Sequence, residues 1–249
     1  SLFVTSVYSL SRYMIGINQS SWNVSAVPGV AVLIFYGICS VVVSKNYKWI
    51  SWLAFLTGLF FHLHFAVVFL IPIVFSFLLF ATDKKKVFIK SLMSLPLFLI
   101  WFVPSIAFQL QSKNSDINLF SNFLKDYWIG GFHLKFFLFR LNDAFAQFQT
   151  MLYLPIQIKL LKFVAPAIFS IFLFFEKDAK KKTLGYLIML WFIIPAFLYA
   201  LYGGTTSEYY VLMNMPMVLY VVYYLQEKFV KKFPKVVALS LLFAVWGFY

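Results

Sequence analysis

The chain alternates long apolar runs with short polar or basic segments. A helix that crosses a bilayer needs about 20 predominantly apolar residues, with about 17 as the lower limit. Uncharged runs of that length occupy residues 24–44, 91–109, 183–207 and 209–226. Residues 163–175 form a further pass if Lys159 and Lys162 extend their ammonium groups to the membrane interface. The pattern therefore predicts several membrane-spanning helices.

The apolar run 49–82 is too long for one crossing and slightly short for two standard ones. Lys45 and Lys48 precede it, and Lys84 and two further lysines follow it. Lysine and arginine collect in cytoplasmic loops, so both ends of the run belong on the same side of the membrane. We therefore expect a helical hairpin whose midpoint lies near residues 64–65.

The same rule orders the rest of the chain. Segments 45–48, 83–90, 176–182 and 227–235 are assigned to the cytoplasm and carry two, four, four and four lysines, fourteen of the 21 Lys and Arg residues. The opposite side receives residues 11–23, the turn at 62–64, residues 111–155 and residues 203–208. The predicted fold class is all-α, a polytopic transmembrane helical bundle with about eight passes or partial passes. It forms a single domain over residues 1–249.

Residues 111–155 are too long and too polar for a turn, so we expect an extracytoplasmic loop. Its second half looks helical until Pro155 ends it. Polar residues fall on both faces of that helix, which therefore predicts an interfacial helix packed against protein on one side.

Composition supports the membrane class. Hydrophobic residues make up 63% of the chain, charged residues 12%, and Phe alone supplies 33 of the 249 positions, so polar groups could not cover a water-soluble domain. The net charge of +13 is collected in short clusters between apolar runs, which argues against nucleic acid as a partner. The single Cys39 lies in an apolar run and reads as a small packing residue.

The ends of the chain indicate a piece of a longer protein. It does not begin with Met, and the last apolar run, 236–249, stops before it could span a membrane. Residues 1–10 read as the end of a helix rather than as a signal peptide.

Polar and ionisable groups near a bilayer are costly, and they mark either a site or a satisfied packing contact. The predicted topology gathers most of them on the side opposite the lysines. The candidate binding residues there are Arg12, Trp22, Asn23, His62, His64, Glu208, Tyr209 and Tyr210. Simpler roles exist for several of them: an arginine at a helix end pairs with headgroups, a glutamate caps a helix start, and tyrosines join the interfacial aromatic belt.

His62 and His64 have three possible roles. At i and i+2 on a helix their side chains diverge by about 200°, so they suit one metal ion only if the backbone breaks between them. Otherwise one caps the helix end while the other hydrogen-bonds a carbonyl, or they contact a phosphate or another part of a substrate. No nucleophile–base–acid constellation, phosphate loop or metalloprotease helix appears in the sequence.

Several landmarks resemble a known family. "YSLSRYMIGINQSSWNVSAVP", "GLFFHLHFAVVFLIP", "LPLFLIWFVPSIAFQLQS" and "EYYVLMNMP" follow one another as they do in bacterial and archaeal integral-membrane glycosyltransferases of the C-type (GT-C) fold. The branch that the chain resembles is related to protein O-mannosyltransferases and lipid A aminoarabinose transferases.

The resemblance implies a sugar donor linked to polyprenyl phosphate and transfer to a lipid, glycan or protein acceptor on the extracytoplasmic side of a prokaryotic inner membrane. The family's catalytic base is an acidic residue in the first outer loop, which would precede Ser1, so this chain alone should be inactive. Arg12, His62 and His64 would neutralise the donor phosphate. Trp22 and Asn23 would line the pocket, and Glu208 with Tyr209 and Tyr210 would close it. Some relatives carry a second acidic residue near this position, whereas this chain has the amide of Asn23 there. A divalent metal is a possible cofactor, with no ligand assigned.

Two alternatives stay open on the sequence. One is a transporter or flippase for a lipid-linked or anionic solute, in which the same Arg and His residues bind substrate without chemistry. The other is an enzyme of the O-antigen ligase or polymerase type.

Overall fold

The computed structural model describes residues 23–63, 70–78, 80–111, 118, 121–122, 125, 134–152, 161–201 and 213–230. Helices are the only regular secondary structure within these ranges, as the all-α prediction requires. They are η1 (Asn23–Ala26), α3 (Val27–Val42), α4 (Trp49–Leu63), α5 (Leu70–Leu78), α6 (Lys84–Leu99), η3 (Ile100–Phe102), α7 (Val103–Gln111), α9 (Leu134–Leu152), α10 (Leu161–Phe174), α11 (Ala179–Leu201) and α12 (Met215–Val230).

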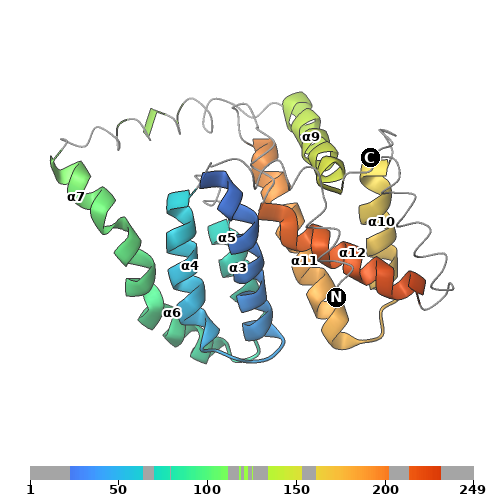
Figure 1. The fold of residues 1–249 in the computed structure, drawn as a ribbon, viewed down its shortest axis with the longest axis horizontal. Helices are drawn as coiled ribbons and strands as arrows, with labels where there is room; N and C mark the ends of the chain where they lie inside the picture. The colour runs from blue at the N-terminus through green and yellow to red at the C-terminus, as the bar shows by residue number, and fades with distance from the viewer. Residues whose placement is uncertain are drawn as a thin grey trace.

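The apolar run 49–82 forms two helices, as the sequence predicts. α4 runs away from the turn at residues 43–48, and α5 runs back to the same end of the bundle (Figure 1). The turn before α4 is tight: Lys45 adopts a positive φ of 56°, and the Asn46 amide donates to the Ser40 carbonyl at 2.9 Å. This closure lets α3 and α4 pack side by side as antiparallel neighbours.

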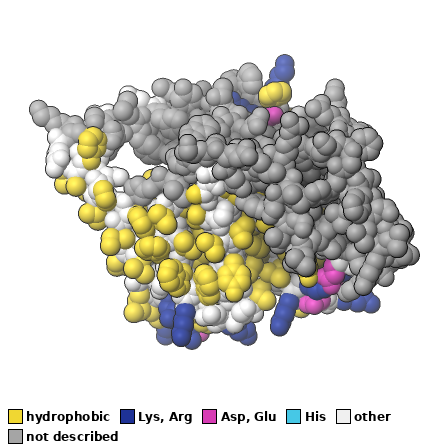
Figure 2. Space-filling model, in the orientation of Figure 1, with side chains coloured by type: hydrophobic (Ala, Val, Ile, Leu, Met, Phe, Trp, Pro, Cys, Tyr) yellow, Lys and Arg dark blue, Asp and Glu magenta, His cyan; other side chains and the backbone are white. Residues whose placement is uncertain are grey.

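The lysine-bearing segments lie at one end of the molecule. The turns at 43–48, 80–83 and 175–178 all lie at the lower end in Figure 1. Figure 2 shows the Lys and Arg side chains of the described residues mainly along this edge, below an apolar face. We call this end of the molecule, with the described turns 43–48, 80–83 and 175–178, the lysine end.

The lysine-rich segments are more helical than the predicted loops. Asp83 caps α6 by accepting a hydrogen bond from the Lys86 amide at 2.9 Å, so the lysines that follow it form the first helical turns rather than a loop. Similarly, α11 begins at Ala179, inside the predicted loop 176–182. Lysine has a good helix propensity, and a capping residue is enough to start a helix at such a position.

Two groups of helices share one core. In the first, α4 packs between α3 and α6; in the second, α9 packs against α11 and α10. α5 and α12 join the groups, because α5 contacts both α3 and α11 and α12 contacts α3, α11 and α9. Trp191 of α11 is fully buried and meets Phe35 of α3 edge-on, with ring centroids 5.4 Å apart. The core is therefore continuous between the two groups of helices.

The second half of segment 111–155 is helical, as predicted, and it packs on protein. α9 places Phe137, Leu141 and Phe145 on one stripe at four-residue spacing. Phe145 meets Phe192 with ring centroids 5.0 Å apart, and Phe137 meets Phe197 at 5.4 Å. Leu138 and Phe139 on the remaining surface are exposed. Its position at a membrane interface stays a prediction.

Two helical stretches in the described part of the chain are long and apolar enough to cross a membrane. One is Lys84–Gln111, in which α6, η3 and α7 continue one another, and the other is Ala179–Leu198. In the first, only 6% of the most apolar window is buried, and side chains such as Phe88, Met93 and Leu110 are exposed. The helices Val27–Val42 and Trp49–Phe61 are apolar but shorter.

Candidate functional site

Most of the predicted binding residues lie outside the described part of the chain. This holds for Arg12, Trp22, His64, Glu208, Tyr209 and Tyr210. Asn23 and His62 are described through their backbone, as the first residue of η1 and a residue in the last turn of α4. The roles of all eight side chains stay predictions.

The structure brings the backbone of Asn23 and His62 to the same end of the bundle. η1 leads into α3 and contacts α4. α3 ends and α4 begins at the lysine end, so the start of α3 and the end of α4 both lie at the opposite end (Figure 1). Two segments separated by a full helical hairpin are thereby neighbours, which is a requirement for a shared pocket.

The start of α12 lies inside the bundle. The described helix begins at Met215, and the Trp191 indole donates to the Met213 carbonyl just before it at 2.7 Å. Trp191 follows Ala179 by twelve residues, so this contact lies about 18 Å along α11 from the lysine end.

Asn214 is a buried polar residue outside the predicted binding group. It is 4% exposed, and its side-chain oxygen has no hydrogen-bond partner among the described residues. A buried acceptor without a hydrogen bond lowers the stability of the fold by about 1–3 kcal/mol. A hydrogen-bond donor placed beside this oxygen would remove that penalty. In the sequence, the feature that could have indicated Asn214 is its position in "MNMP", close to the predicted Glu208–Tyr210 group.

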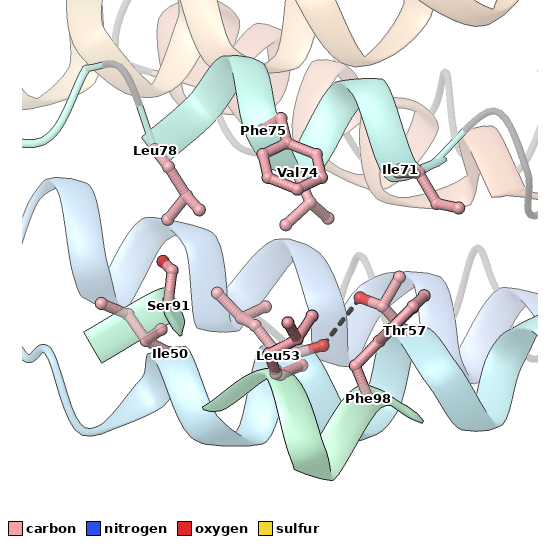
Figure 3. A pocket seen from close by; sticks show the side chains of 11 residues that line it. Ile50, Leu53, Thr57, Ile71, Val74, Phe75, Leu78, Ser91 and Phe98 are labelled. Carbon is pink, nitrogen blue, oxygen red and sulfur yellow. Dashed lines mark hydrogen bonds between the residues drawn. The ribbon is translucent and has the colours of Figure 1, made fainter. Parts of the chain in front are cut away.

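A second feature is an apolar groove between α4, α5 and α6, with a cavity of about 240 Å³. We call it the α4–α6 groove. Its walls are Ile50, Leu53, Ala54 and Thr57 of α4, Ile71, Val74, Phe75 and Leu78 of α5, and Ser91, Leu95 and Phe98 of α6. Figure 3 shows the α5 side chains on one side and those of α4 and α6 on the other. With such walls, the groove suits a hydrocarbon chain better than a sugar or a charged group.

Polar contacts in and beside the groove are few. Thr57 donates its hydroxyl to the Leu53 carbonyl at 2.7 Å, and the Ser51 and Ser94 hydroxyls hydrogen-bond each other at 2.9 Å between α4 and α6. The Ser91 hydroxyl oxygen is buried and has no partner among the described residues. This hydroxyl can therefore still donate a hydrogen bond to a ligand in the groove.

An ionic cluster lies at the lysine end, between the α10–α11 turn and α12. Glu176 accepts from Lys228 at 2.7 Å and from the Tyr224 hydroxyl at 2.9 Å, while Lys181 pairs with Glu227. The Lys228 hydrogen bond is the main reason why the pKa of Glu176 falls from its ordinary 4.5 to about 2. A carboxylate held ionised in this way is a poor proton acceptor near neutral pH. We therefore assign the cluster a structural role and not that of a catalytic base.

No group of three or more His, Cys, Asp or Glu residues that could hold a metal ion occurs within the described ranges. The possible divalent metal of the sequence analysis consequently has no ligand set in this part of the chain.

Comparisons with known proteins do not add a relative. Neither protein-family models, nor curated proteins, nor solved structures give a match to this chain.

Proposed function

We propose that the chain belongs to a multi-pass protein of a prokaryotic inner membrane, with about eight passes or partial passes. The support is the pair of membrane-capable stretches, the exposed apolar surface of Lys84–Gln111, and the lysines gathered at one end. A contiguous apolar surface of this kind is unfavourable in water and favourable in lipid. The lysine end would face the cytoplasm.

Within that setting we propose a membrane glycosyltransferase of the GT-C type, which moves a sugar from a polyprenyl-phosphate donor to a lipid, glycan or protein acceptor outside the cytoplasm. The observation that carries the proposal is the convergence of the Asn23 and His62 backbones at the end opposite the lysines. A donor pocket built from the ends of several helices needs this convergence.

The roles follow from chemistry. Arg12, His62 and His64 would hydrogen-bond the donor phosphate, because charge-assisted bonds stabilise the negative charge of the leaving group. Trp22 and Asn23 would line the sugar site, and Glu208, Tyr209 and Tyr210 would cover it. Asn214, buried at the end of the same segment, could accept a hydrogen bond from a sugar hydroxyl.

A transfer assay tests the proposal. The protein, at the length its gene encodes, is purified in detergent and given a radiolabelled polyprenyl-phosphate sugar with lipid, glycan and protein acceptors. We expect label on one acceptor. Arg12→Ala, His62→Ala and His64→Ala should each weaken donor binding about tenfold or more, since each removes a charge-assisted hydrogen bond. Lys85→Ala, at the opposite end, is the matched control and should bind donor as the unaltered protein does.

Transport is the competing outcome. If no acceptor receives label and the labelled lipid crosses the membrane of proteoliposomes, the protein is a flippase or transporter and the transferase proposal fails. Unchanged donor affinity in all three alanine variants would assign Arg12, His62 and His64 to structural roles.

A further inference from the structure

The α4–α6 groove opens to the side of the bundle. Its floor is buried, with Leu53 2% and Thr57 5% exposed, whereas Phe75 of α5 and Leu95 of α6 at its edges are 64% and 44% exposed. From Ile50 to Thr57 it follows α4 for about 10 Å. An apolar slot that runs along the helices and is open at its edges can admit a flexible hydrocarbon chain laterally from a bilayer.

One end of the groove lies at the lysine end and carries the unpartnered hydroxyl. Ile50, Leu78 and Ser91 line it there, because α4 begins, α5 ends and α6 begins at that side. The Ser91 hydroxyl oxygen is shielded from solvent without a hydrogen-bond partner among the described residues (Figure 3). Thr57, nearer the other end, already donates to the Leu53 carbonyl. A ligand in the groove would therefore meet its hydrogen-bond donor at the lysine end.

Charge at that end is strongly positive. Lys84 precedes Ser91 by seven residues on α6, which places the two within about 20° of each other around the helix. Between residues 43 and 90 the chain carries six lysines, Lys45, Lys48, Lys84, Lys85, Lys86 and Lys90, and one acidic residue, Asp83. The single Asp83 carboxylate, which also caps α6, offsets only one of these six positive charges. The mouth of the groove thus attracts an anion.

We propose that the α4–α6 groove binds one acyl chain of an anionic phospholipid from the leaflet on the lysine side. The phosphate lies against Lys84, and the Ser91 hydroxyl donates a hydrogen bond to the ester carbonyl of the chain. This inference goes beyond sugar transfer and rests on the proposed membrane location. A second copy of the chain is a poor occupant because two lysine ends repel each other. The polyprenyl-phosphate donor is another poor occupant, since its predicted phosphate partners lie at the opposite end.

The test measures which lipid the purified protein retains. Protein in mild detergent is mixed with equal amounts of phosphatidylglycerol and phosphatidylcholine of the same chain length, and bound lipid is counted by native mass spectrometry. We expect one phosphatidylglycerol to be retained in preference. Lys84→Gln should lower that retention about fivefold, the effect of one lysine near an anionic headgroup. Ala54→Trp, which places an indole in the groove, should abolish the preference.

Two variants serve as matched controls. Met93→Trp adds the same indole on α6 at a position that is 74% exposed and does not line the groove. Lys177→Gln removes an exposed lysine from the α10–α11 turn, also at the lysine end. Both should retain phosphatidylglycerol as the unaltered protein does. Since Lys84 is an exposed residue, its variant reports on binding even if Ala54→Trp disturbs folding.

Equal retention of the two phospholipids would overturn the proposal, as would undiminished retention in Lys84→Gln. Preferential binding of polyprenyl phosphate over phosphatidylglycerol at this groove would also overturn it. The assay does not involve the sugar-transfer reaction. A protein that retains phosphatidylglycerol through Lys84 but transfers no sugar would keep this assignment and contradict only the glycosyltransferase proposal.

Discussion

Glu176 ties the α10–α11 turn to α12 through a single carboxylate, and its effect depends on pH. Because folding lowers the pKa of Glu176 from 4.5 to about 2, its contribution to stability is fully present above about pH 4.5 and is lost as the pH falls towards 2. Glu176→Gln should lower the free energy of unfolding in detergent by about 1–3 kcal/mol at pH 7, the usual value of hydrogen bonds to a charged group. The difference between the variant and the unaltered protein should shrink between pH 4.5 and 2.

The control for Glu176 is the exposed Lys177, whose replacement by Gln should leave the free energy of unfolding within about 0.5 kcal/mol of the unaltered protein. A stability difference for Glu176→Gln that stays constant from pH 7 to pH 2 would show that the carboxylate is not held ionised by Lys228.

Replacement of Asn214 distinguishes a role in binding from a role in packing. Its buried oxygen lacks a partner among the described residues, so the similarly sized Asn214→Leu should fold with a free energy of unfolding equal to or above that of the unaltered protein. If the amide contacts the sugar, the same variant should bind donor about tenfold less tightly. Donor affinity is measured by titration with the labelled lipid. Loss of stability with unchanged donor affinity would indicate a structural amide.

At the scale of helices, close packing of α4 on α6 depends on Gly58. A Cβ at this position would lie 2.6 Å from the Phe98 carbonyl oxygen, a backbone atom that cannot rotate away. Gly58→Ala should therefore destabilise the protein by about 1–3 kcal/mol, as other overpacked sites do. The matched control is Gly29→Ala in α3, where nothing lies within 4 Å, and which should stabilise it by up to about 1 kcal/mol. Thermal unfolding in detergent measures both, and equal effects would contradict the close approach.

Helix positions followed well from local pattern, and helix boundaries did not. The predicted passes 163–175 and 183–207 correspond to α10 (Leu161–Phe174) and α11 (Ala179–Leu201), because a long apolar run specifies a helix wherever it packs. The described part of α12 begins at Met215, inside the predicted pass 209–226, and just before it the Trp191 indole holds the chain from a distance of 22 positions. Apolar periodicity carries no information about a partner so far away in sequence.

At the scale of the whole molecule, the proposed orientation predicts which residues face outside. Single cysteines at Gln19 and Thr206, in a Cys39→Ser background, should react with a membrane-impermeant thiol reagent in intact cells. Lys85→Cys, at the lysine end, is the control and should react only after lysis. Labelling of position 19 or 206 only after lysis would overturn the orientation, as would labelling of position 85 in intact cells.

The sequence alone determined the helical class, the hairpin in residues 49–82, and the gathering of lysines in short segments between apolar runs. These features depend on local apolar runs and on the preference of charge for water, which each segment expresses by itself. Tertiary structure decided the contact between Trp191 and the start of α12 and the ion pair between Glu176 and Lys228. It also decided that a groove lined by Ser91 lies between α4, α5 and α6. Each of these joins residues far apart in the chain, and such contacts arise from side-chain shape and helix packing rather than from local pattern.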